Sequence, residues 1–225
     1  MVNKPMGMFW VLLSLIGCGE SLPVCPTGMV TIPAGTVRLG VENPSALWHE
    51  AAHETTLSTY CIDQYEYPNQ KGALPKAQVT FEEAESLCVA VGKRLCSADE
   101  WERACRGAEG HRYTYGDVRD ANACNTPIDG TGPGRKAPPL AASGDHAECK
   151  SAEGVMDLGG NLSEWVSDPW DGGVEPFRPG AKSDPKTWRT VRGGTMWSQT
   201  FYGQECTSRH GHPMASAGGF SNVDD

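Results

Sequence analysis

Long apolar runs, basic clusters and nucleotide-binding motifs are all missing from this sequence of 225 residues. The longest mainly apolar run covers residues 8–16, whereas a transmembrane helix needs about 20 residues. The 19 Lys and Arg residues are outnumbered by 28 Asp and Glu, and the resulting net charge of −9 repels a phosphate backbone. Gly-rich phosphate loops, nucleophile elbows and dinucleotide fingerprints are absent. The sequence therefore predicts neither a permanent transmembrane helix nor a nucleic-acid partner.

The N-terminus has the layout of an export signal, because Lys4 precedes the apolar run. The run ends in Leu15-Ile16-Gly17-Cys18, which resembles the lipobox of bacterial lipoproteins, where the cysteine is lipidated and becomes the first residue of the mature chain. We predict that residues 1–17 are a signal peptide and that Cys18 anchors an exported protein to a membrane, on its periplasmic or cell-surface face. An ordinary signal peptide cleaved nearby is the alternative.

Cysteine usage supports the same compartment. Nine cysteines are present, and setting Cys18 aside leaves an even number, which in an exported chain predicts up to four disulfides. A mixture of disulfides and buried thiols is the alternative. We expect the local pair Cys88–Cys96 to be one of the bridges. The candidates are Cys25, Cys61, Cys88, Cys96, Cys105, Cys124, Cys149 and Cys206.

Residues 18–26 form a short tether in this interpretation, and residues 27–225 form a single α+β domain. The 27 Gly and 16 Pro residues are typical of many turns and irregular loops. Residues 29–40, rich in β-branched side chains and bounded by Pro and Gly, predict a short hairpin. A further strand is expected over residues 56–63.

Two helices are predicted from paired N-terminal signals. Thr80 with Glu83, and Ser97 with Glu100, each have the spacing of a capping box ahead of an apolar stripe. The stripes predict helices of about three turns each, which end at Gly92 and Gly107. After Gly107 we expect short strands and long loops.

Several of these segments, in this order, resemble the formylglycine-generating enzyme (sulfatase-modifying factor) family. The first half of the resemblance lies in residues 61–66, 79–84 and 92–107, and the second half in residues 154–165 and 192–195. It covers about residues 27–225 and implies a C-type-lectin-like fold with two main helices, short antiparallel strands, long loops and bound calcium. It also implies a disulfide between Cys105 and Cys206, with Cys124 as the competing partner.

The segment from Asp157 to Glu164 is the main metal candidate. Its two carboxylates flank glycines that let the backbone turn carbonyls inward, and oxygen ligands suit Ca²⁺ better than Zn²⁺. The resemblance implies ligation by the side chains of Asp157 and Glu164 and by the carbonyls of Gly160 and Leu162. A surface turn in which Glu164 caps or pairs locally is the alternative.

A second calcium site is a weaker expectation from the resemblance. It would use Asn122, the carbonyl of Ala123 and a downstream acid such as Asp129.

The enzymes of this family use two cysteines that bind copper(I) to oxidise a substrate cysteine with oxygen. Counted from Gly193-Gly194, the two positions are Ser198 and Gly203 here, and neither supplies the thiolate that Cu(I) requires. The surrounding motif also departs from the family: Thr195 replaces a Ser, Ser163 replaces a Trp, and residues 219–221 lack an Arg. We therefore expect neither bound copper nor formylglycine formation.

Residues His49 to His53 match the zinc motif H-E-x-x-H, with Glu50 as the general base. The motif requires a helix, and Pro44 after a capping residue would permit one. The metzincin continuation fails, because Thr56 and Thr59 stand at its Gly and third His positions. We therefore expect no zinc, and a zinc hydrolase is a minor alternative.

Three functions of different classes follow. The first is a non-catalytic, calcium-stabilised binding or assembly module on a lipid anchor, with a protein or glycan ligand of unknown identity. The second is an oxidoreductase of the formylglycine-generating type that has moved its thiol chemistry, for example to Cys206. The third is the zinc hydrolase. Cys206, His210 and His212 could hold a soft metal, although a bridged Cys206 could not. Aromatic contact candidates, which could equally be core residues, are Trp170, Phe177, Trp197, Phe201 and Tyr202.

Overall fold

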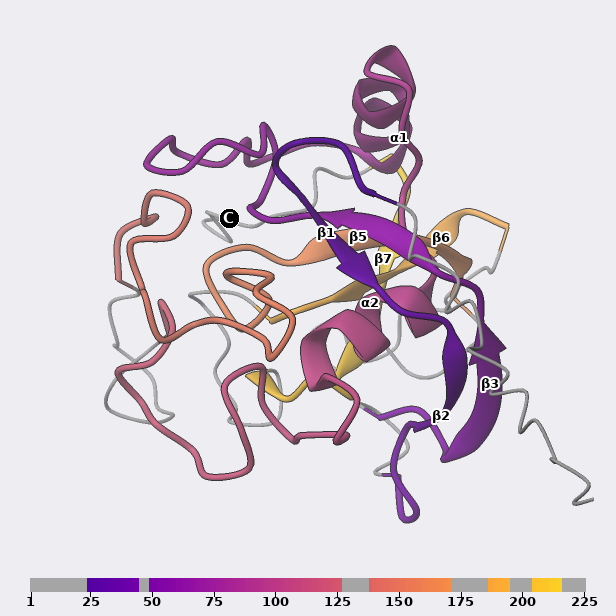
Figure 1. Cartoon of the computed structure of the whole chain (residues 1–225). Helices are drawn as coiled ribbons and strands as arrows, with labels where there is room; N and C mark the ends of the chain where they lie inside the picture. Colours follow the sequence, from indigo (N-terminus) through magenta and orange to yellow (C-terminus); the bar gives the residue numbers. More distant parts are fainter. Residues whose placement is uncertain (1–23, 45–48, 127–137, 171–185, 195–203, 216–225) are drawn as a thin grey trace, which may run out of the picture.

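The computed structural model describes residues 24–44, 49–126, 138–170, 186–194 and 204–215 (Figure 1). The predicted signal peptide, Cys18 and most of the predicted tether lie outside these residues. The described elements, in chain order, are β1 (Met29–Ile32), β2 (Gly35–Leu39), β3 (His53–Leu57), β4 (Tyr60–Asp63), α1 (Phe81–Ala90), α2 (Ala98–Arg106), β5 (Glu164–Pro169), β6 (Trp188–Arg192) and β7 (Arg209–Pro213). This mixture confirms the α+β class. Neither described helix has the length or apolar character needed to cross a membrane.

The first four strands form one long antiparallel ribbon. β1 pairs with β4 and β2 pairs with β3, and both ladders keep the same register, with Ile32 opposite Tyr60 and Gly35 opposite Leu57. The hairpin expected within residues 29–40 is therefore wrong, since β1 and β2 follow one another along the same side. The reason is Pro33, which has no N–H to donate and interrupts the ladder without reversing the chain. The strand expected over residues 56–63 is interrupted at the matching point.

Both helices begin as predicted. Thr80 Oγ1 accepts from the Glu83 backbone N–H, and the Glu83 carboxylate accepts from the Thr80 N–H. Ser97 and Glu100 form the same reciprocal pair at the start of α2. The helix ends also agree: α2 is capped by Gly107 with φ +66°, a conformation that favours glycine. The capping boxes therefore predict both helices correctly.

The two helices differ in how they pack. α2 lies in the core, where Trp101, Ala104 and Cys105 are at most 2% exposed because their spacing puts them on one face. This face packs against strands β2, β5 and β6. α1 lies at the edge of the molecule (Figure 1) and buries only Phe81 completely. Val89, near the end of α1, is exposed.

The C-terminal half contributes a three-stranded antiparallel sheet in the order β5-β6-β7. The central strand β6 is the most buried of the three, and its last residue, Arg192, is fully buried. Strand β5 begins and strand β6 ends at the same end of the sheet, where the backbones of Glu164 and Arg192 are opposite one another in the ladder. Two family-like parts of the sequence, residues 154–165 and 192–194, are thereby joined at one edge.

Three disulfides link segments that are distant in sequence: Cys25–Cys61, Cys105–Cys206 and Cys124–Cys149. The bridge between Cys105 and Cys206 is the one that the family resemblance implied. Cys88 and Cys96 are free thiols, so the predicted pair Cys88–Cys96 is wrong. Cys88 belongs to α1, whereas the Cys96 carbonyl accepts from the Ser167 N–H and holds Cys96 against β5. The short separation of Cys88 and Cys96 in sequence therefore did not predict that they belong to different structural elements.

Candidate functional site

The loop before β5 reverses direction within a few residues. Asp157 and Asn161 have φ of +63° and +57°, and Gly160 has φ +102°. A Cβ atom on Gly160 would lie 2.6 Å from Thr126 Cγ2 and 2.7 Å from the Asn125 carbonyl oxygen, so only glycine fits there. The Gly160 N–H donates to the Gly193 carbonyl at 2.7 Å. The loop is therefore held against the Arg192-Gly193-Gly194 segment.

The two carboxyl groups predicted to bind calcium are both held by this loop. Asp157 is 5% exposed, and its Oδ2 accepts from the Gly144 N–H at 2.7 Å. Burial raises the pKa of Asp157 to about 6. Glu164 Oε2 accepts from Trp101 Nε1 at 2.5 Å, and burial, with a contribution from the charge of Asp157, raises the pKa of Glu164 to about 7. Within the described ranges neither carboxylate forms a salt bridge.

Glu66 is a third buried acid near these two. The sequence analysis did not single it out. Its Oε2 accepts from Asn161 Nδ2 at 2.7 Å and from Ser143 Oγ at 3.4 Å, while its Oε1 has no hydrogen-bond partner among the described residues. Burial raises the pKa of Glu66 well above its usual value, and the charges of Glu164 and Asp157 add to the shift. The only available signal was its place in the family-like segment 61–66.

This donor set is suited to a hard cation. Asp157 is buried, Glu164 is half-buried, and neither forms a salt bridge within the described residues, whereas a carboxylate removed from water is stable only when it is neutralised or paired. Oxygen ligands on a turning backbone are those that Ca²⁺ prefers. The side chains of Asp157 and Glu164 therefore suit the ion that the family resemblance implies.

A buried charge network positions the adjoining Arg192-Gly193-Gly194 segment. Arg192 is fully buried and donates to Glu102 Oε2 at 3.1 Å and to Glu50 Oε2 at 2.9 Å. Glu102, on α2, also accepts from the Gly40 N–H at 2.6 Å and from Arg106 at 3.1 Å. Removing one member would leave an uncompensated charge in the core, so the network fixes the direction in which the chain leaves β6.

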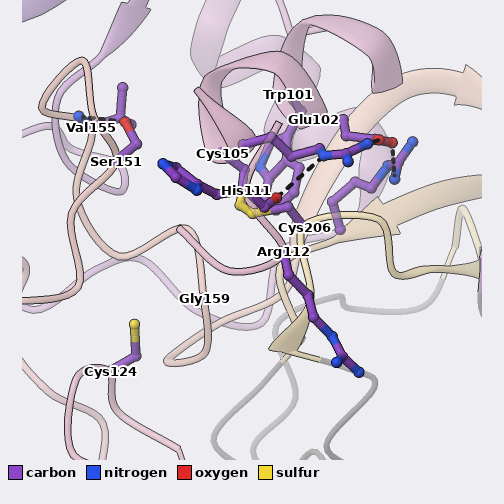
Figure 2. The surroundings of a disulfide bond; sticks show 12 residues. Trp101, Glu102, Cys105, His111, Arg112, Cys124, Ser151, Val155, Gly159 and Cys206 are labelled. Carbon is purple, nitrogen blue, oxygen red and sulfur yellow. Dashed lines mark hydrogen bonds and ion pairs between the residues drawn. A yellow bond between two sulfur atoms is a disulfide. The ribbon is translucent and has the colours of Figure 1, made fainter. Parts of the chain in front are cut away.

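Ser198 and Gly203, which the family resemblance places at the catalytic cysteine positions, lie outside the described residues, as does Thr195. Cys206 is described, and its sulfur is bonded to that of Cys105 beneath α2, close to Trp101 and Glu102 (Figure 2). A disulfide sulfur has no thiolate to offer a metal or a substrate. The expectation that thiol chemistry could have moved to Cys206 is therefore wrong.

The zinc motif does not form the helix that it requires. His49 forms an isolated bridge with Ser208, Ala51 pairs with Val41, and His53 begins β3. The two histidines consequently diverge, because His49 faces Glu205 at 3.6 Å. The zinc-hydrolase alternative is therefore wrong in its geometry.

Glu50, His53 and Asp99 nevertheless bring their ligand atoms within 4.8 Å of one another. His53 Nε2 lies 3.0 Å from Asp99 Oδ1, and its Nδ1 lies 3.1 Å from the Ala51 carbonyl. Glu50 is bound by the guanidinium of Arg192. The group is therefore an ion-pair cluster whose donors and acceptors are already engaged.

The remaining candidates are resolved in part. Ala123 is 3% exposed and Asn122 donates its backbone N–H to Asp120, but Asp129 lies outside the described residues. His210 and His212 lie on β7, where burial lowers the pKa of His210 to about 3, and the bridged Cys206 cannot complete a soft-metal set with them.

Trp170 is 3% exposed and belongs to the core rather than to a contact surface. The other aromatic candidates, Phe177, Trp197, Phe201 and Tyr202, lie outside the described residues.

The fold and these joined segments define an α+β domain of the formylglycine-generating type. Residues 67–221 match the family described as sulfatase-modifying factor enzyme 1-like domain, FGE-sulfatase. The chain belongs to this family.

Relatives in sequence have varied names. The chain is 31% identical over 144 residues to the serine/threonine-protein kinase Pkn1 of Chlamydia trachomatis, and 23% identical over 256 residues to the formylglycine-generating enzyme of Thermomonospora curvata. It is 33% identical over 137 residues to the hercynine oxygenase of Mycolicibacterium thermoresistibile. These matches use 60%, 78% and 54% of this chain, and they span 21% of the kinase, 84% of the formylglycine-generating enzyme and 29% of the oxygenase.

Two solved structures share the fold. PvdO from Pseudomonas aeruginosa superposes with a TM-score of 0.56 at 20% identity, and Treponema denticola variable protein 1 with a TM-score of 0.58 at 17% identity. Each match covers 84% of this chain and 90% of the other. At this identity the likeness shows the fold alone.

Proposed function

We propose that this chain is a non-catalytic, calcium-stabilised binding or assembly module, held at a membrane by lipid on Cys18. The observation that carries the proposal is that no free thiol stands at the family's catalytic positions or at the nearby Cys206. By the family resemblance, Ser198 and Gly203 occupy the positions of the enzymes' cysteine pair. Cys206, close to them in sequence, is bonded to Cys105. Copper(I) chemistry on two converging thiolates has no residues to carry it at this place.

The two remaining thiols do not offer a substitute. Burial raises the pKa of Cys88 above its usual value and raises that of Cys96 to about 12. Both groups are therefore protonated at neutral pH, and the thiolate is the form that binds metals and attacks substrates. The alternative, an oxygen-dependent oxidoreductase of the formylglycine-generating type that acts on protein cysteine, is disfavoured by this thiol chemistry.

In this proposal calcium would stabilise the folded chain and would take no part in a reaction. When bound, the ion would neutralise two carboxyl groups whose pKa values burial raises. Asp157 and Glu164 would bind it through their side chains, and Gly160 and Leu162 through their carbonyls. Since the loop 157–164 is also bonded to Gly193, the ion would stabilise the joint between the two family-like segments.

Export and anchoring are supported by the cysteines. Three disulfides suit an oxidising compartment. The bridge Cys25–Cys61 lies a few residues after Cys18 and would fasten the tether to β4. A protein or glycan ligand remains the expected partner.

The proposal is tested by metal analysis and by an activity assay on the purified protein. We expect calcium but no stoichiometric copper, and no conversion of cysteine to formylglycine in a sulfatase-type peptide supplied with copper and oxygen. The double variant Ser198→Cys/Gly203→Cys is the matched control, because it restores the thiol pair in the same chain. Conversion by the unaltered protein, measured as the accompanying mass loss, would overturn the proposal.

A further inference from the structure

The apolar stripe of α1 faces space that no side chain fills. Ala84, Leu87, Cys88 and Val91 recur at the spacing of one helix face, which normally packs against a core. None of the four is fully buried, and Val91 is 54% exposed. All four line a cavity of about 560 Å³, and small-molecule sites measure roughly 300–1,000 Å³. The apolar face of α1 thus covers this cavity without filling it.

The cavity runs along the helix. The stretch from Ala84 to Val91 rises about 10 Å at the helical repeat, and the cavity follows it to the helix C-cap. The wall is completed mainly by apolar side chains, among them the buried Leu158 and Leu162. This length and lining suit a flexible apolar chain.

The charged side chains at the wall pair with one another. Lys93 Nζ lies 2.6 Å from Asp63 Oδ1, and Arg94 donates two hydrogen bonds of 2.6 and 2.7 Å to the Glu100 carboxylate. A third basic residue, Lys76, is exposed, so its charge is solvated. These groups therefore attract neither a cation nor an anion into the interior.

Two further acids line the cavity without offering a charge to it. Glu66 Oε1 is completely buried, and Oε2 accepts from Asn161 Nδ2. Burial raises the pKa of Glu66 well above its usual value and so favours the neutral acid. Glu164 accepts from Trp101 Nε1, and calcium would engage it in our proposal.

The other polar groups of the wall are also satisfied or neutral. The Tyr60 hydroxyl donates to the Glu100 carbonyl, and Trp165 Nε1 donates to the Val79 carbonyl. The thiols of Cys88 and Cys96 line the cavity in their protonated forms, because burial raises both pKa values. The wall therefore presents aliphatic groups, aromatic rings and uncharged sulfur.

We infer that this cavity binds one unbranched hydrocarbon chain, the acyl chain of a lipid, along the apolar stripe of α1. The methylene groups of the chain need no polar partner, and removing them from water is favourable. A charged headgroup inside would lose its hydration without gaining a partner, so the headgroup stays at the mouth.

The chain has two sources, a free lipid and the lipid proposed on Cys18. The tether enters the fold at the cavity, because Pro26 lines it and Cys25 is bonded to Cys61, which lines it as well. The residues from Cys18 to Cys25 span at most about 25 Å. A lipid on Cys18 would therefore be held near the cavity at a raised effective concentration. This source rests on the proposed anchor, whereas binding of a free chain does not.

The first test uses the mature chain without lipid, carrying Cys18→Ser and exported behind an ordinary cleavable signal. Calorimetric titration with butan-1-ol, hexan-1-ol and octan-1-ol in calcium chloride should show affinity rising about fourfold for each methylene. Octanoate and octylammonium should bind no more tightly than octan-1-ol. The inference fails if octan-1-ol does not bind, or if either ion binds about tenfold more tightly than the alcohol.

A matched pair of variants locates the site. Ala84→Phe fills the cavity from α1 and should weaken octan-1-ol about tenfold. Ala90→Phe makes the same change on the exposed side of the helix and should leave the affinity unchanged. In the chain without these variants, octan-1-ol should slow alkylation of Cys88, which keeps the test valid if Ala84→Phe disturbs folding. Equal effects of the two variants, or binding that leaves Cys88 alkylation unchanged, would overturn the inference.

The second test separates the two sources in membranes. Cells that express the protein are supplied with a photoactivatable fatty acid, and crosslinked peptides are mapped. A lipid on Cys18 would join the peptide that begins at Cys18 to a peptide of α1 or of residues 155–165, and Cys18→Ser would abolish this link. A free lipid would leave only its own mass on those peptides, with or without Cys18. The mass of the N-terminal peptide reports separately whether Cys18 is lipidated. Crosslinks confined to other parts of the chain would contradict the inference.

Discussion

Trp101 Nε1 donates a hydrogen bond of 2.5 Å to Glu164 Oε2 and thereby joins the middle of α2 to the first residue of β5. Trp101 is 2% exposed and Glu164 is half-buried, so the bond is largely shielded from water. The same contact orients one of the two carboxylates proposed to bind calcium. A helix predicted from its capping box thus supports a loop predicted from its acids and glycines.

The first prediction concerns this bond. Trp101→Phe keeps an aromatic ring but removes the donor, and it should lower the free energy of unfolding by about 3 kcal/mol through the lost bond and the smaller ring. Trp165→Phe is the matched control, because Trp165 Nε1 donates to a neutral carbonyl and its loss should be smaller. Urea denaturation of both variants measures the difference. Equal losses would show that the carboxylate contact adds nothing.

The second prediction concerns the metal. Calcium that binds only the folded chain stabilises it by mass action, so chelation should lower the melting temperature, and restored calcium should reverse the change. Asp157→Asn should remove most of this response. Glu54→Gln, an exposed acid on β3, should keep it. A melting temperature that is the same with chelator and with calcium, in a protein that purifies without calcium, would refute the site.

How far the sequence could predict this structure depends on the distance over which each signal acts. The capping boxes at Thr80 and Ser97 are local, and both helices follow from them. The hairpin expected around Pro33 failed because strand pairing is decided by partners far along the chain: β1 pairs with β4 rather than with β2. The family resemblance implied the long-range bridge Cys105–Cys206 where residue spacing could not.

The candidate site shows the same difference between local signals and long-range contacts. Asp157 and Glu164 were predicted as calcium ligands because two acids flank glycines within one loop and the family resemblance implies the same residues. Glu66 was missed because its place beside this loop depends on a contact that is distant in sequence: Asn161 Nδ2 donates to its carboxylate at 2.7 Å. The histidine motif at residues 49–53 misled for the converse reason. Its spacing has chemical meaning only on a helix, and tertiary pairing with Val41 and Ser208 holds this segment in an extended form.

The third prediction counts thiols. Chain unfolded without reductant should incorporate two alkyl groups among the described cysteines, at Cys88 and Cys96, and the folded protein should react slowly because both thiols are buried at least in part and have raised pKa values. Cys88→Ser should reduce the count to one. Peptide mapping identifies the sites. Labelling of Cys206 under these conditions would contradict its bridge to Cys105.

The fourth prediction concerns pH. Burial alone would lower the pKa of His53, but the Ala51 carbonyl and the Asp99 carboxylate outweigh it, so the pKa is raised. A histidine whose pKa is higher in the folded state contributes stability below its unfolded value of about 6.5, and this contribution disappears as the pH rises through the folded value. His53→Gln should therefore destabilise the protein more at acidic than at alkaline pH.

Asp99→Asn provides the control for this histidine, because it removes the partner and leaves the ring. The double variant His53→Gln/Asp99→Asn should lose little more than either single variant, since the two side chains form one contact at 3.0 Å. Denaturation curves at several pH values measure both effects. A loss for His53→Gln that does not change with pH would exclude the ion pair.

The last prediction concerns the anchor. If Cys18 carries lipid, Cys18→Ala should either release the protein from the membrane fraction or block its processing, because acyl chains would be its means of attachment in our proposal. Cys88→Ser serves as the control, since it removes a cysteine that is not expected to be lipidated and should leave fractionation unchanged. Intact-mass measurement separates the possibilities: lipidated protein should begin at Cys18 and carry the mass of its acyl groups. Unchanged fractionation and mature mass in the Cys18→Ala variant would show that the apolar residues 8–16 act as an ordinary cleaved signal or that attachment has another origin.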